Sequence, residues 1–84
     1  MVYQQLLEAL DIGLDERGTG SAMIYPLPDL TRAGIVQRVG TPFQADLGEG
    51  GAIVLLYVVE GGRALIVGQE NNGVITRGIV FIDT

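Results

Sequence analysis

Four residue types are missing from this chain of 84 residues: cysteine, histidine, lysine and tryptophan. Without cysteine there can be no disulfide, no thiolate metal site and no cysteine nucleophile. The absence of histidine removes the commonest general base and the commonest transition-metal ligand, and with them any Ser-His-Asp triad. The absence of lysine excludes Schiff-base chemistry and a P-loop lysine. We therefore expect a protein that is not an enzyme and that uses no cofactor or metal ion.

Positive charge is also scarce. Five arginines are the only cations, and ten acidic residues bring the formal net charge to −5. Phosphate binding needs clustered cations, and these arginines are scattered along the chain. We therefore expect no nucleic-acid partner, and we interpret the acidic surface first as a solubility device.

Long apolar runs are absent as well. The longest contains eight residues, whereas a membrane-spanning helix needs about 20. Residues 1–5 carry no basic side chain, and Glu8 and Asp11 interrupt the apolar stretch that a signal peptide requires. The sequence thus predicts an intracellular, cytoplasmic protein with no membrane partner.

Three segments have a superficial likeness to functional motifs. Residues 18–23 open like a dinucleotide fingerprint, but Met23 stands where the third glycine belongs. Residues 11–22 suggest a calcium loop, yet Ala22 occupies the position of the bidentate glutamate. Asp46 and Glu49 are carboxylates close in sequence, in a glycine-rich stretch with no sign of a pocket. We expect none of the three to bind a ligand or to catalyse a reaction.

What the chain has is apolar sequence in unbroken runs. Hydrophobic residues make up 48% of the chain, and they fill residues 52–59, 64–67 and 79–82. A strand with one wet face alternates apolar and polar residues, whereas a strand covered on both faces is continuously apolar. A domain of this size buries only roughly 60–65% of its unfolded surface. The runs therefore predict a sheet that needs a partner surface, most simply a second copy of the chain.

The N-terminal segment, residues 2–14, carries a helical pattern. Its apolar residues fall at spacings of three and four, on one stripe: Val2, Tyr3, Leu6, Leu7, Leu10 and Leu14. Gly13 predicts the end of a helix of about ten residues. The stripe is expected to pack on the sheet.

Residues 30–39 fit two structures. A helix would place Leu30, Ala33 and Val36 on one face with Asp29 as its N-cap. A strand would suit the β-branched residues of this segment, and Gly34 disfavours a helix by about 1 kcal/mol relative to alanine. The balance favours a strand over residues 33–39, with at most one helical turn at 29–32.

The other strands are bounded by turn residues. Residues 22–25 predict a short strand that Pro26 either places at a sheet edge or ends. Residues 43–47 predict a short extension. Strands over 52–59, 63–69 and 74–83 are expected to form a meander.

Glycines mark the corners of this meander. A two-residue turn at Gly61-Gly62 would set Glu60 opposite Arg63 as an exposed ion pair. A second turn is predicted by Asn72-Gly73, the strongest hairpin signal in the chain. Inside the strands, Gly68 and Gly78 indicate bulges or the close approach of another backbone.

The predicted architecture is a single α+β domain over residues 1–84. One N-terminal helix packs on an antiparallel sheet of four or five strands that ends in a β-meander. The alternative is a small closed β-barrel with a helix, in which the core packs on itself and the outside is wet. The poor alternation of the strands favours the open sheet.

The predicted function is that of a non-enzymatic structural or protein-interaction module that self-associates through its apolar sheet. Another protein is the alternative partner. Tyrosine and arginine often anchor interfaces, and Arg77 is flanked by apolar residues. The candidate interface residues are Val54, Leu56, Tyr57, Val80, Ile82 and Arg77.

Two other function classes remain open at this point. The first is a small-ligand-binding or regulatory domain, with an apolar pocket in which Arg32, Arg38 and Arg77 hold an anionic ligand. The second is an acidic inhibitor of a nucleic-acid-binding protein, which rests on the net charge alone. The small size and the lack of motifs would suit a gene of a phage or mobile element.

Overall fold

The computed structural model describes residues 1–12 and 22–83. Their elements follow the chain in this order: α1 (Tyr3–Ala9), β1 (Ala22–Leu27), β2 (Leu30–Thr31), α2 (Arg32–Val39), β3 (Gln44–Leu47), η1 (Glu49–Gly51), β4 (Ala52–Val59), β5 (Gly62–Asn71) and β6 (Val74–Asp83). The motif-like segments at residues 11–22 and 18–23 lie mostly outside the described residues, as does Gly13.

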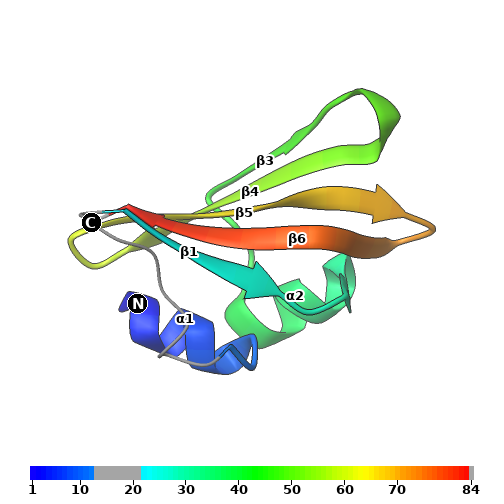
Figure 1. Ribbon diagram of the computed structural model, residues 1–84. Helices are drawn as coiled ribbons and strands as arrows, with labels where there is room; N and C mark the ends of the chain where they lie inside the picture. Colours follow the sequence, from blue (N-terminus) through cyan, green and yellow to red (C-terminus); the bar gives the residue numbers. More distant parts are fainter. Residues whose placement is uncertain (13–21, 84) are drawn as a thin grey trace.

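The strands form one open antiparallel sheet in the order β1-β6-β5-β4-β3, with the two-residue β2 also paired to β6. Strands β4, β5 and β6 are the predicted meander. Figure 1 shows both helices beneath the sheet, on the same side. The predicted α+β class is confirmed, and the barrel alternative is wrong because β1 and β3 are separate edges that do not pair with each other.

Helix α1 is shorter than its apolar stripe suggested. Its N-terminus is supported by Gln5, whose side-chain oxygen accepts a hydrogen bond from the Val2 N–H at 3.3 Å. Its C-terminus is a Schellman motif, in which the Ile12 N–H donates to the Leu7 carbonyl and the Asp11 N–H to the Glu8 carbonyl. Asp11 takes the left-handed conformation (φ 62°) that this motif requires. The helix therefore ends before Gly13.

The described part of the stripe packs on the core, and Leu14 lies outside the described residues. Leu6, Leu7 and Leu10 are completely buried, while Tyr3 packs at the margin of the core. The N-terminus is also tied to the sheet, because the Glu60 N–H donates to the Met1 carbonyl at 2.7 Å. This bond joins the start of the chain to the turn between β4 and β5.

The strand expected over residues 33–39 is wrong, and so is the helical turn at 29–32. Leu30–Thr31 form β2, and Arg32–Val39 form helix α2. Its N-cap is Thr31 rather than Asp29, and the Thr31 hydroxyl accepts from the Gly34 N–H at 2.9 Å. A Cβ at Gly34 would lie 2.8 Å from the Thr31 hydroxyl oxygen. Gly34 counted against a helix on sequence grounds. In the structure, its lack of a side chain leaves room for the Thr31 hydroxyl that caps α2. Ile35 and Val39, one turn apart, then bury on the core.

The β4–β5 turn is displaced by one residue from its expected place. Val59 pairs with Gly62, so Glu60 and Gly61 occupy the turn, and only Gly61 has a positive φ, at 82°. Arg63 consequently faces Val58 across the hairpin, and the expected Glu60–Arg63 pair does not form. Arg63 instead forms an exposed ion pair of 3.5 Å with Asp83 of β6.

The Asn72-Gly73 turn is confirmed. Both residues have positive φ, 53° and 82°, as a type I′ hairpin turn requires, and Asn71 pairs with Val74. Pro26 is confirmed at a sheet edge, within β1. Both observations follow from local chemistry that needs no tertiary contact.

A bulge interrupts the β5–β6 ladder, as the glycines indicated. Val67 pairs with Ile79 and Gln69 with Thr76, so Gly68 alone faces Arg77 and Gly78. A Cβ on Gly68 would come within 2.6 Å of the Ile75 side chain, and one on Gly78 within 2.7 Å of Leu27. Arg77 takes φ 52°, a conformation uncommon for a residue with a side chain.

The cap of α2 provides a test of this local structure. Replacing Thr31 by alanine should lower the free energy of unfolding by about 1 kcal/mol, since an N-cap hydrogen bond is lost. Chemical denaturation at one fixed protein concentration measures this change. The control is Thr41→Ala, at an exposed position outside the helices and strands. Equal stabilities of the two variants would show that the Thr31 cap contributes nothing.

Candidate functional site

The helices pack against only one of the two faces of the sheet. Residues of the inner face meet α1 and α2 and form the core with them. No described helix lies on the outer face (Figure 1). The strands nevertheless carry apolar side chains on this side as well.

The strand register shows how these side chains are arranged. One row across the outer face runs Ile24, Phe81, Leu65, Leu56 and Gln44, from β1 to β3. The next row runs Pro26, Ile79, Val67, Val54 and Asp46. Each row is apolar on four adjacent strands and polar only at β3. We call the apolar set the open face: Ile24, Pro26, Val54, Leu56, Val58, Leu65, Val67, Ile79 and Phe81.

The open face is accessible to solvent. Val58 is 60% exposed, Ile24 50% and Ile79 37%. Leu56, Leu65 and Phe81 lie between neighbouring strands and are half-buried. Scattered exposed apolar residues are ordinary, but a contiguous apolar surface on four strands is characteristic of an interaction site.

Polar groups surround this surface on three sides. Gln44 and Asp46 line the β3 side, where the Gln44 amide donates to the Asp46 carboxylate at 3.1 Å. The Arg63–Asp83 ion pair lies at one end of the strands, and the Gln69–Thr76 pair lies at the other. An apolar centre with a polar rim is the usual anatomy of a protein interface.

The structure divides the candidate interface residues between the two faces. Val54 and Leu56 belong to the open face. Tyr57, Val80 and Ile82 lie on the inner face and are only 5%, 0% and 0% exposed. Those three side chains form the core of the folded chain, so they are not available to contact another molecule.

Arg77 is exposed, at the bulge of β6. Among the described residues it forms no ion pair. It lines an open hollow of about 510 Å³ together with Gly50, Gln69, Glu70, Asn71 and Thr76. This hollow is polar, and neither Arg32 nor Arg38 lines it. The expected apolar pocket with three arginines is therefore not assembled there.

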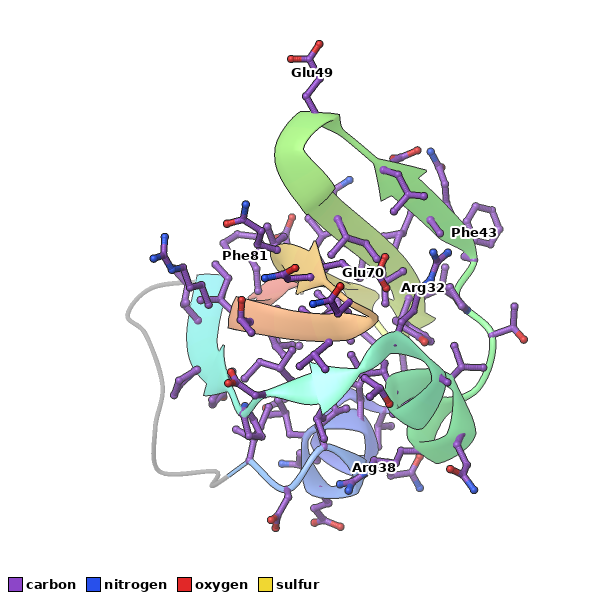
Figure 2. The ribbon with its side chains drawn as sticks, turned by 90° about the vertical axis from the view of Figure 1, so that its right-hand side faces the viewer. Arg32, Arg38, Phe43, Glu49, Glu70 and Phe81 are labelled. Atoms are coloured by element: carbon purple, nitrogen blue, oxygen red, sulfur yellow. The ribbon has the colours of Figure 1, made fainter. Side chains whose placement is uncertain are left out.

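The other polar candidates are also separate. Arg38 donates to the Ala9 carbonyl at 3.4 Å and so joins α2 to α1. Glu49 lies at the tip of the β3–β4 hairpin and points away from the body of the molecule (Figure 2). Asp46, which is close to Glu49 in sequence, accepts hydrogen bonds from the Gln44 amide. Within residues 1–12 and 22–83, no group of three or more acidic side chains could hold a metal ion.

Sequence reasoning missed most of the open face. The members that were not among the candidate interface residues are Ile24, Pro26, Val58, Leu65, Val67, Ile79 and Phe81. In strand β4 the odd-numbered positions are all buried and the even-numbered positions are not. The sequence carries no signal of this division, because residues of both parities are apolar.

Comparison with known proteins found no matching protein family, curated protein or solved structure. None of the helices described is long and apolar enough to cross a membrane. The functional argument therefore depends on the geometry of the sheet.

Tyr57 acts within the monomer. Its hydroxyl donates a hydrogen bond of 2.7 Å to the Gly40 carbonyl, which ties β4 to the end of α2. This bond supplies the partner that a buried tyrosine hydroxyl needs. Burial raises the pKa of the Tyr57 phenol, because the charged form is poorly solvated there.

This pKa shift predicts a pH dependence of stability. Since the folded state holds the phenolic proton more tightly, the contribution of Tyr57 is complete below the unfolded pKa of about 10 and is lost at higher pH. Tyr57→Phe should cost about 1 kcal/mol at neutral pH, through the lost hydrogen bond. The difference in unfolding free energy between the two proteins should shrink above about pH 10. A difference that stays constant across this range would contradict the assignment.

Proposed function

We propose that this protein is a non-enzymatic module that self-associates by packing the open face against the open face of a second copy. The observation that supports this proposal is the row of apolar side chains on four adjacent strands, with no described element over them. Burying such a surface is favourable by roughly 25 cal/mol per Å².

The area of the sheet is sufficient for such a contact. Four strands spaced about 4.8 Å apart, each contributing about six residues, present a projected area of about 380 Å² per copy. Protruding side chains make the accessible area larger than the projection. With this added area, two copies would bury about 1,000 Å², which is the lower limit of a specific interface. Two sheets stacked in this way lie about 10 Å apart.

The distribution of charge favours a second copy as the partner. The charged side chains of this face, Arg63, Asp83 and Asp46, all lie at its rim, and the first two are already paired. Two open faces can meet without burying an isolated charge, which would be costly. An apolar surface is also complementary to itself, as an interface related by a twofold axis must be.

Substitutions on the open face test this proposal. Val58→Glu introduces a charge at a side chain that is 60% exposed in the monomer, so the fold should tolerate it. Val54→Glu places a charge nearer the centre of the face. Because each dimer would lose two buried valines, we expect the dissociation constant to rise by about 100-fold.

The measurement is light scattering coupled to size exclusion over a wide concentration range. Wild type should be larger than the 8.9 kDa monomer, and both variants should shift toward monomer. The matched control is Gln37→Glu, an exposed position on α2, beneath the other face. A wild-type protein that is monomeric throughout, or folded variants that keep the wild-type mass, would refute the proposal.

A further inference from the structure

The two edges of the sheet differ in how they are protected. Edge strands carry unpaired backbone groups, and natural proteins block them with proline, charge or bulges. Strand β1 contains Pro26, which has no N–H to donate. Strand β3 contains no proline, and every one of its residues is exposed. Two large apolar side chains accompany it: Phe43 is 75% exposed and Leu47 63%.

The hydrogen bonds of the β3–β4 pair identify which backbone groups of β3 are free. The Gly48 N–H donates to the Ala52 carbonyl at 2.8 Å. Because bonded and non-bonded pairs alternate in an antiparallel ladder, Asp46 and Gln44 also bond to β4. The alternation ends at Phe43, whose N–H donates to the Leu56 carbonyl of β4 at 2.8 Å. Ala45 and Leu47 therefore direct their N–H and C=O groups away from β4, toward the free edge.

The side chains of β3 alternate between the faces. Gln44 and Asp46 lie on the outer face, in the rows described above, and Ala45 and Leu47 lie on the inner side. The helices do not cover the inner side of β3, since Leu47 remains exposed there, and Phe43 is exposed as well. Figure 1 shows the β3–β4 hairpin extending away from the helical layer, and Figure 2 shows Phe43 at its outer margin.

We propose that β3 pairs antiparallel with β3 of a second copy, in a register centred on Ala45. In this register the two Ala45 residues form a hydrogen-bonded pair through their free backbone groups. Gln44 then lies opposite Asp46 of the other copy, and Phe43 lies opposite Leu47. The twofold axis is perpendicular to the sheet, so inner and outer faces remain continuous across the junction.

The side chains of β3 fit this register. Gln44 donates to Asp46 within one chain at 3.1 Å, and the register provides the same donor–acceptor pair between chains. The apolar pair Phe43–Leu47 occurs twice, once on each side of the axis, and covers surface that is exposed in the monomer. A register centred on Asp46 would instead oppose two carboxylates, which is unfavourable.

This contact uses a different surface from the open face. The edge contact extends the sheet within its own plane, whereas the contact of open faces stacks one sheet on another. The two contacts are compatible in one assembly, in which each copy has one partner at its edge and another on its open face. The edge contact can therefore be tested without assuming the other.

Amide hydrogen exchange of the wild-type protein is the first test. In the monomer the Ala45 and Leu47 N–H groups face solvent, so they should exchange rapidly while those of Gln44 and Asp46 are protected. At high protein concentration the Ala45 amide should become protected, at least 10-fold, and dilution should remove this protection. Rapid exchange of Ala45 at all concentrations would overturn the proposal, as would protection that persists in the monomer.

A substitution at the same residue is the second test. Ala45→Pro removes the outward N–H without removing a bond to β4, and the matched control Ala45→Val keeps that N–H. The Ala45→Pro variant should have a lower mass than wild type, equal to that of an assembly joined by open faces alone. The Ala45→Val variant should have the same mass as wild type. If Ala45→Pro disturbs the fold, judged by circular dichroism, Leu47→Lys replaces it, because that side chain is exposed.

The two proposals fail in distinguishable ways. In Val58→Glu the open face is disrupted, so protection of the Ala45 amide at high concentration should persist if the edge contact is independent. If Val58→Glu no longer assembles and the Ala45 amide is unprotected in wild type, the open-face contact is supported and the edge contact is refuted. If the Ala45 amide is protected in wild type and Val58→Glu keeps the wild-type mass, the edge contact is supported and the open-face contact is refuted.

Discussion

Two short helices on one side of a wide sheet are the constraint on which the rest of this structure depends. A helix with its side chains is about 10 Å across, so α1 and α2 side by side cover about 20 Å. Five strands span about 24 Å. The two helices are therefore wide enough to cover the inner face of only four strands. The outer face receives no cover from the described elements, and β3 extends beyond the helices, where Phe43 and Leu47 are exposed.

The bulge in β6 decides which apolar residues enter the core. Continuing the β5–β6 pairing from the Asn72-Gly73 turn without interruption would place Ile79 opposite Ile66, on the inner face. The extra residue at Arg77–Gly78 shifts the register, so Val80 faces Ile66 and Ile79 faces Val67. Because side chains alternate along a strand, one inserted residue exchanges the faces of everything that follows. The tight contacts at Gly68 and Gly78 show why only glycine fits beside this bulge.

The open face and the β3 edge would contribute different properties to an assembly. Apolar burial supplies most of the free energy of association but little direction, since it depends on area. Backbone pairing at an edge contributes few bonds, yet these fix orientation and register. Both surfaces together would supply what the proposed self-association needs. The polar rim, with its Arg63–Asp83 pair, limits how two open faces can be superimposed.

Local patterns of the sequence determined α1, the Asn72-Gly73 turn, the edge position of Pro26 and the presence of apolar residues on both sides of the strands. The tertiary structure decided α2, whose cap depends on the fit of Thr31 against Gly34. It also decided the faces: Val54 and Leu56 lie on the outer face of the sheet, while Tyr57, Val80 and Ile82 are core. A continuous apolar run has no period that marks its inner side. That side is set by where the helices pack and by a bulge that shifts the register by one residue.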